Sequence, residues 1–210
     1  MNTRNIKLNT EHLLLFVIFP IALVFDYSIY IKLVIGLLAL IYVIFISVKH
    51  KYFKKLQVNK RHKQIFFKHL AIKFLIIVLL TFLITFIFYK EALFNAVKSN
   101  LPRYFIILGV YVFFSVIPQE FIYRKFYFQR YQNLFKNDTQ LIIINTLVFC
   151  LGHLFFKNLL VLLITLVGGL VFSLSYKKFQ SFKWICLEHS LYGLWLYTVG
   201  LGGLLGFPVN

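Results

Sequence analysis

The sequence predicts an all-α protein, a polytopic transmembrane helical bundle of about seven helices. Of its 210 residues 60% are hydrophobic and 20% aromatic, whereas only 14% are charged. A soluble globular chain is about 45–50% apolar and about 25% charged, so this composition excludes a water-soluble domain. Backbone groups in lipid must be satisfied within the segment that carries them, and we therefore expect the apolar stretches to be helices.

The apolar stretches set where the helices are expected. Crossing the hydrocarbon core takes about 17–25 mostly apolar residues, so the second and sixth stretches look short for full spans. The last stretch is expected to break at its glycines, and Gly168-Gly169 either lets a neighbouring helix pack closely or is a tolerated flexible pair. The stretches lie near residues 13–31, 33–48, 70–89, 104–123, 140–156, 158–175 and 184–206.

The net charge of +17 lies mainly in short loops between these stretches. This distribution is typical of the positive-inside rule and of attraction to anionic lipid head groups, and it argues against a nucleic-acid partner. We expect the 49–68 loop to be cytoplasmic, with the loops around 124–138 and 176–183 on the same side and the C-terminus outside. The basic residues of the first loop are Lys49, Lys51, Lys54, Lys55, Lys60, Arg61 and Lys63.

Few ionisable residues lie within the apolar stretches. A charge at membrane depth costs about 2.5–3.5 kcal/mol on insertion scales and usually has a function. Glu120 and Glu188 lie in or beside apolar stretches, and His153 and His189 are embedded in them. Because these residues concentrate on the fourth, fifth and seventh predicted helices, one convergent site is favoured over separate packing roles.

Glu120 is followed four residues later by Arg124, so the two share a helix face and can pair. The pair alone is better explained by helix packing, in which Arg124 neutralises a carboxylate that holds helices together. With two histidines, however, a glutamate suits the activation of water: the carboxylate accepts a proton, one histidine orients the water and the other donates to the oxyanion. The sequence lacks G-x-S-x-G, a deeply embedded aspartate and H-E-x-x-H, so other intramembrane hydrolase chemistries are not supported.

Metal binding is a separate hypothesis. Cys150 and His153 form one C-x-x-H pair, and Cys186 and His189 form a second. Two sulfurs and two nitrogens would suit zinc, although buried thiols are more often small apolar side chains. Glu120, His153 and His189 are an alternative ligand set. We expect no cofactor.

Three short motifs carry a family resemblance. Residues 119–124, QEFIYR, are similar to E-E-x-x-x-R; residues 149–153, FCLGH, match F-x-x-x-H; and residues 189–193, HSLYG, are similar to H-x-x-x-N. In this order, over about residues 100–200, they resemble the CPBP intramembrane proteases, the CAAX prenyl protease and bacteriocin-processing family also called Abi. The departures are Gln119 and Gly193.

The resemblance implies a role for each matching residue. Glu120 becomes the base, His153 its partner, His189 the oxyanion donor and Arg124 the orienting cation. Gln119 stands where the family has its leading glutamate, and position 193 supplies no side-chain donor. The implied alternatives are therefore that Glu120 has taken over as base, with Gln119 or Tyr192 donating to substrate, or that the chain is a non-catalytic relative.

The resulting hypothesis is an intramembrane endopeptidase that hydrolyses a peptide bond in a membrane-associated protein or peptide, with or without a lipid on that substrate. A catalytically silent scaffold or immunity protein that binds a partner is the first alternative, and a small transporter is the second. We expect one structural domain in a prokaryotic inner membrane. Residues 1–100 would form the N-terminal helices and the basic loop, and residues 101–210 the catalytic core helices.

Because basic loops stay in the cytoplasm, single cysteines placed in the 49–68 loop should react with a membrane-impermeant thiol reagent only from the cytoplasmic side. The measurement compares sealed cells with inverted vesicles in a background lacking Cys150 and Cys186. A matched cysteine near Lys98 should give the opposite pattern. Labelling of the 49–68 loop from outside sealed cells would reverse the orientation.

Overall fold

A computed structural model describes residues 3–53 and 60–207 of the chain. Within those ranges all regular structure is helical and no strand occurs, so the predicted all-α class is confirmed. The chain falls into two compact units. Unit 1 comprises Met1–Lys55 and Gln119–Lys177, and unit 2 comprises Leu56–Pro118 and Lys178–Asn210. Lys54 and Lys55 of the predicted basic loop lie outside the described residues.

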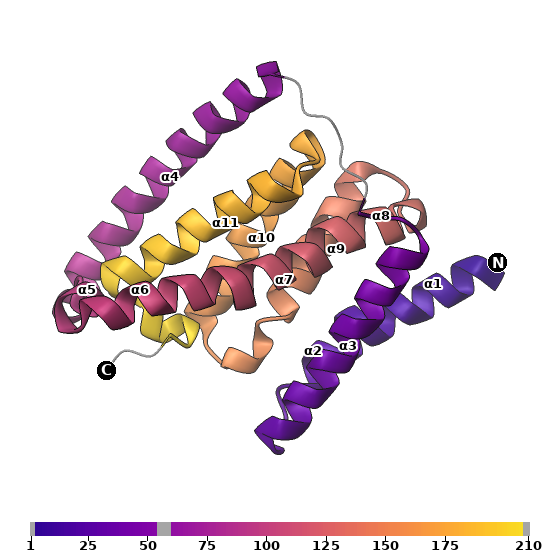
Figure 1. Ribbon diagram of the computed structural model, residues 1–210, viewed down its shortest axis with the longest axis horizontal. Helices are drawn as coiled ribbons and strands as arrows, with labels where there is room; N and C mark the ends of the chain where they lie inside the picture. Colours follow the sequence, from indigo (N-terminus) through magenta and orange to yellow (C-terminus); the bar gives the residue numbers. More distant parts are fainter. Residues whose placement is uncertain (1–2, 54–59, 208–210) are drawn as a thin grey trace. The chain divides into compact units, whose positions relative to one another are not determined.

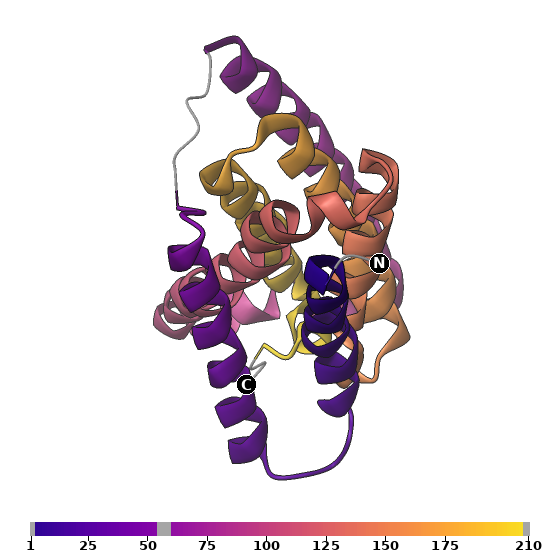
Figure 2. The same ribbon diagram turned by 90° about the vertical axis from the view of Figure 1, so that its right-hand side faces the viewer.

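Unit 1 begins with a helical hairpin. Its first arm is continuous through α1 (Thr3–Leu13), the π-helical turn Leu14–Ile18 and α2 (Phe19–Ala22). Residues 23–28 then lead into α3, which runs back antiparallel to the first arm (Figure 2). The other elements of unit 1 are α3 (Ile29–Lys49), η4 (Phe121–Phe126), α8 (Tyr127–Tyr131), η5 (Gln132–Leu134), α9 (Asp138–Leu151) and η6 (Leu154–Phe156), together with the second half of α7 (Ile117–Glu120) and most of α10 (Leu159–Phe179).

Unit 2 is organised around two helices, α4 and α11, which run side by side (Figure 1). Phe74 of α4 stacks on Tyr192 of α11 with ring centroids 6.2 Å apart, and the Trp195 indole N–H donates to Thr81 Oγ1 at 2.7 Å. The elements of unit 2 are α4 (Lys60–Phe88), η2 (Lys90–Ala92), α5 (Asn95–Ser99), α6 (Leu101–Val110), η3 (Tyr111–Val116), α11 (Phe182–Leu196), η7 (Tyr197–Leu201) and η8 (Gly202–Leu205).

Several helical stretches are long and apolar enough to cross a membrane. Large apolar side chains face outward from them, as Phe113 and Phe114 do with 67% and 80% of their surface exposed. Such faces suit contact with lipid, and the chain is a multi-pass membrane protein. Within the described ranges, five helical stretches qualify as candidate spans: Ile29–Lys49, Arg61–Phe88, Leu101–Leu134, Asp138–Phe156 and Leu159–Phe179.

Some of the predicted boundaries were wrong. The expected helix at 13–31 ends at Ala22, and α3 begins after the polar residues Asp26 and Ser28. The second and sixth stretches are not short, because α3 and α10 each have 21 residues. The helix expected to begin at residue 70 begins at Lys60. Lysine, arginine and glutamine are good helix formers, so the helix extends beyond its apolar stretch into the basic segment.

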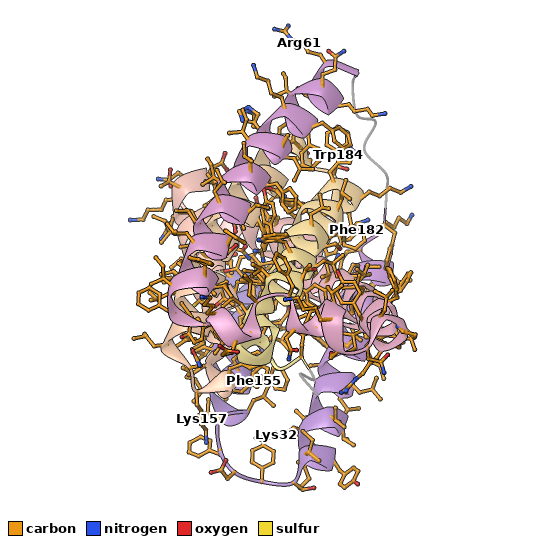
Figure 3. The ribbon with its side chains drawn as sticks, turned by 90° about the vertical axis from the view of Figure 1, so that its left-hand side faces the viewer. Lys32, Arg61, Phe155, Lys157, Phe182 and Trp184 are labelled. Carbon is orange, nitrogen blue, oxygen red and sulfur yellow. The ribbon has the colours of Figure 1, made fainter. Side chains whose placement is uncertain are left out.

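Contacts between polar side chains place several loops at common ends, as the alternation of spans predicts. In unit 1, Arg130 contacts His50 at 3.2 Å and Lys177 pairs with Asp138 at 2.6 Å. At the opposite turn of the hairpin, Lys157 pairs with an aspartate of the 23–28 loop at 3.1 Å. Figure 3 shows Lys157 and Lys32 at one end of unit 1.

The ends of α4 and α11 in unit 2 also meet. Figure 3 shows Arg61 at the start of α4 and Phe182 and Trp184 at the start of α11 toward the same end. The Trp184 ring stacks on Phe66 with centroids 4.8 Å apart, and an amphipathic aromatic next to basic residues is typical of the membrane–water interface. The loops that precede these two helices therefore share a side.

The structure decides between the alternatives for one glycine and confirms the expected break at another. A Cβ atom on Gly169 would lie 3.0 Å from Phe149 Cδ1 and 3.3 Å from the Thr146 carbonyl oxygen, so α9 and α10 pack closely at this point. Gly200 has φ 115° and interrupts the helical backbone after α11, as expected. A side chain at that φ would be strained, because the left-handed region disfavours residues that carry a Cβ.

The Glu11 carboxylate joins α1 to α3 and α8. It accepts hydrogen bonds from Arg130 Nε at 2.8 Å and Nη2 at 2.6 Å, from the Tyr131 hydroxyl at 2.7 Å and from the Tyr42 hydroxyl at 2.8 Å. Burial alone would raise the pKa of Glu11, but these hydrogen bonds and the Arg130 charge outweigh it and lower the pKa below the ordinary value of 4.5. The ionised carboxylate is therefore part of the folded structure.

Glu11→Gln is expected to destabilise the folded protein by about 1.5–3 kcal/mol, because hydrogen bonds to a charged group are lost. Since the folded-state pKa is lowered, the wild-type advantage is present above the unfolded pKa and is lost as the pH falls through the folded value. Unfolding in detergent at pH 7 and at pH 3 measures both effects. The control Asp26→Asn removes the charge of a side chain that is 90% exposed and should cost less than about 1 kcal/mol; an equal cost would contradict the prediction.

Candidate active site

Glu120 and Arg124 form a buried ion pair in unit 1. Glu120 ends α7, and the π-helical turn Phe121–Phe126 that follows carries Arg124. Both side chains are fully buried, and Arg124 Nε lies 3.6 Å from Glu120 Oε2. The pairing predicted from the four-residue spacing is confirmed. Single π-helical turns often occur at functional sites because they redirect side chains within a helix.

Aromatic rings enclose the Arg124 guanidinium. Its central carbon lies 4.3 Å from the Phe149 ring centroid and 5.7 Å from that of Phe172. Nη2 donates to the Gly169 carbonyl oxygen at 3.3 Å, whereas Nε and Nη1 make no hydrogen bond within the described part of the chain. Cation–π attraction is strongest where water is excluded, so the two rings and the carboxylate together stabilise this cation.

An amide and a hydroxyl side chain support the same region. Asn145 Nδ2 donates to the Tyr123 carbonyl oxygen at 2.7 Å. The Ser173 hydroxyl lies 2.7 Å from Asn145 Oδ1 and 2.6 Å from the Gly169 carbonyl oxygen, and it can donate to one of them at a time. Asn145 was not among the site residues predicted from the sequence. Its position inside the apolar stretch 140–156 could have indicated a structural role, because a buried amide requires hydrogen-bond partners.

His153 follows the end of α9. Its Nδ1 lies 2.8 Å from the Phe149 carbonyl oxygen, and its ring is parallel to that of Phe156 with centroids 6.1 Å apart. A carbonyl oxygen only accepts, so Nδ1 carries a proton and Nε2 is an acceptor in the neutral ring. A Cβ atom on Gly152 would overlap the Tyr123 hydroxyl, which shows how closely the residue before His153 approaches the helix of Glu120.

Unit 2 contains a second buried carboxylate, Glu188. It is fully buried, and its Oε1 accepts hydrogen bonds from Lys73 and, at 2.9 Å, from the Tyr192 hydroxyl. Its Oε2 makes no hydrogen bond to any residue that the structure describes. The Tyr192 hydroxyl therefore uses its hydrogen in a hydrogen bond to Glu188. Lys73 was not among the site residues predicted from the sequence, although a lysine within an apolar stretch was a visible signal.

His189 lies next to Glu188 on α11 and is only 8% exposed. The edge of its ring faces Tyr111 of η3, with centroids 6.2 Å apart and planes at 78°. Gln119, Glu120, Arg124 and His153 therefore belong to unit 1, and His189 belongs to unit 2.

No group of three His, Cys, Asp or Glu side chains that could hold a metal ion occurs among residues 3–53 and 60–207. Cys150 and Cys186 are free thiols, and Cys150 Sγ donates to the Leu162 carbonyl oxygen at 3.3 Å. The metal alternatives considered from the sequence remain untested hypotheses.

These features define a multi-pass α-helical membrane protein with two buried carboxylates, Glu120 and Glu188, and a buried histidine, His189, in its helices. Residues 101–195 match the protein family described as Type II CAAX prenyl endopeptidase Rce1-like. The matched segment contains all three motifs, so the predicted resemblance to the CAAX prenyl protease family is confirmed. No curated protein and no solved structure matches the chain.

Arg124→Ala is expected to destabilise the protein by about 3–5 kcal/mol, because it leaves a buried carboxylate without its cation. Arg124→Lys should be intermediate, since lysine keeps the charge but loses the planar group that stacks on Phe149. Unfolding in detergent measures both changes. Lys177→Ala, which breaks an exposed pair with Asp138, is the matched control. Wild-type stability in Arg124→Ala would contradict the structural role of the pair.

Proposed function

We propose that the protein is an intramembrane endopeptidase that hydrolyses a peptide bond in a membrane-associated protein or peptide. The observation that carries the proposal is the buried Glu120–Arg124 pair, which lies within the segment that matches the endopeptidase family. A charge kept at such depth is costly and usually functional. Packing alone would be served at lower cost by apolar side chains of similar volume.

Each residue has a defined part in the proposed reaction. Glu120 accepts a proton from water, and Arg124 holds the carboxylate in place. His153, whose Nδ1 is bound to a backbone carbonyl, presents Nε2 to accept a hydrogen bond from the same water. The water oxygen adds to the peptide carbonyl carbon, and His189 donates to the oxyanion that forms. The C–N bond then breaks, and the proton held by Glu120 passes to the departing amine.

Two departures from the resembling motifs support a second candidate function, in which the protein is not catalytic. Gln119 has an amide where the resembling motif has a carboxylate, and position 193 has no side chain. A silent scaffold or immunity protein, which acts by binding a partner, would tolerate both changes. The two candidates differ in one measurable property, because the scaffold would keep its function when Glu120 is replaced.

The substrate is proposed to lie in or next to a prokaryotic inner membrane. The family description names CAAX prenyl endopeptidases, so the first substrate to test is a farnesylated peptide that ends in Cys-aliphatic-aliphatic-X. The purified protein in liposomes would be incubated with this peptide and with the same peptide without the lipid. Mass spectrometry of the products would locate the cleaved bond and decide whether the lipid is required.

In the inserted and folded protein, Glu120→Gln should reduce kcat about 10²–10⁴-fold, because glutamine keeps the size of the side chain but cannot accept the proton. His153→Ala should reduce kcat similarly. The double variant should be little worse than either single variant, since residues that act as a unit are non-additive. The readout is kcat on whichever of the two peptides the wild type cleaves.

Asp138→Asn is the matched control, because it removes an exposed carboxylate of unit 1, and its kcat should stay at the wild-type value. Gln119→Glu tests the departure from the motif: kcat should rise if position 119 is the better base, and fall if two adjacent carboxylates then share one proton. Full proteolysis by a well-folded Glu120→Gln protein would overturn the catalytic assignment.

A further inference from the structure

The hydroxyl of Tyr111 lies where a side chain at position 193 would be. A Cβ atom built on Gly193 would overlap Tyr111 Oη and would lie 2.5 Å from Cζ and 2.6 Å from Cε1. Both residues belong to unit 2, Tyr111 at the start of η3 and Gly193 within α11. The missing side chain on α11 therefore creates the space that the phenol fills.

Tyr111 also lies beside His189. Positions 189 and 193 are one helical turn apart and share a face of α11. The Tyr111 ring meets the His189 ring edge-on at 6.2 Å, and it contacts Phe207 with centroids 4.9 Å apart. These contacts hold the phenol next to His189, with its hydroxyl directed at the backbone of Gly193.

The reaction proposed above calls for hydrogen-bond donors to the oxyanion. Gly193 has no side chain to donate, where the resembling motif carries asparagine, and the Tyr192 hydroxyl donates to Glu188. A phenolic O–H is a good donor, and tyrosine hydroxyls act in this role in oxyanion holes. The Tyr111 hydroxyl, which approaches this face of α11 from η3, fills the volume that a side chain at position 193 would occupy.

We propose that Tyr111 is a catalytic residue, which donates a hydrogen bond to the oxyanion together with His189. This inference rests on the proposed endopeptidase function. The phenolic proton stays on the tyrosine throughout, so the proton balance of the hydrolysis is unchanged. Tyr111 supplies from η3 the donor that α11 lacks at position 193.

The first test is Tyr111→Phe, which removes the hydroxyl and keeps the ring packed against His189 and Phe207. We expect kcat to fall about 10²-fold, the loss typical of one oxyanion donor, with KM changed less than about twofold because substrate binding before the reaction does not use this bond. Tyr104→Phe is the matched control. It removes a hydroxyl on α6 that bonds Thr198 at 2.8 Å, and it should keep the wild-type kcat.

The second test moves the donor from η3 to α11. Gly193→Asn alone should lose activity, because its Cβ would collide with the phenol. Tyr111→Ala alone should lose activity because the donor is gone. The double variant removes the collision and restores an N–H donor, and its kcat should exceed that of either single variant at least about tenfold. A double variant no more active than Tyr111→Ala would contradict the donor role.

The outcomes separate this inference from the proposed function. Cleavage by wild type and equally by well-folded Tyr111→Phe would overturn the role of Tyr111 and leave the endopeptidase function standing. A wild-type protein that cleaves neither peptide would overturn the endopeptidase function and this inference with it. Binding of a phosphonate analogue of the cleaved peptide, which carries a tetrahedral anion, gives a readout without turnover: Tyr111→Phe should weaken it about tenfold or more, and Tyr104→Phe should not.

Discussion

The arrangement of unit 1 depends on a buried charge in an apolar environment. Arg124 and its partner Glu120 are both fully buried, and an unpaired charge at such a position is strongly destabilising. The groups that surround the cation come from separate elements: Phe149 from α9, and Phe172 and the Gly169 carbonyl from α10. One guanidinium therefore ties η4, α9 and α10 together, and the close approach of α10 is possible because residue 169 has no side chain.

Unit 2 meets the same constraint in a different way. Glu188 is paired with Lys73, which comes from α4, and with Tyr192, which is one turn further along α11. The cation thus comes from a helix far away in the sequence, whereas Glu120 has its cation within the same helical stretch. The Lys73–Glu188 pair fixes α11 against α4 at the position that precedes His189, so the orientation of this histidine depends on a tertiary contact.

Near each of the two candidate histidines, a tyrosine hydroxyl from another element occupies the space left by a glycine. Gly152 precedes His153 and leaves room for the Tyr123 hydroxyl, and Gly193 leaves room for that of Tyr111. A side chain at either glycine would displace a phenol from the vicinity of a histidine. The surroundings of these two histidines are therefore set by the tyrosine that fills the space at the glycine, as well as by the residues of the motifs themselves.

The sequence alone determined the helical class, the approximate spans and the loops that share an end, because apolar runs and basic loops are local patterns with a direct physical meaning in a bilayer. It also predicted the pair of Glu120 and Arg124, since residues four apart meet on one helix. Only the tertiary structure decided that Lys73 pairs with Glu188 and that Tyr111 fills the space at position 193. Those contacts join helices distant in the chain, and their geometry depends on the packing of side-chain volumes, which leaves no periodic signal in the sequence.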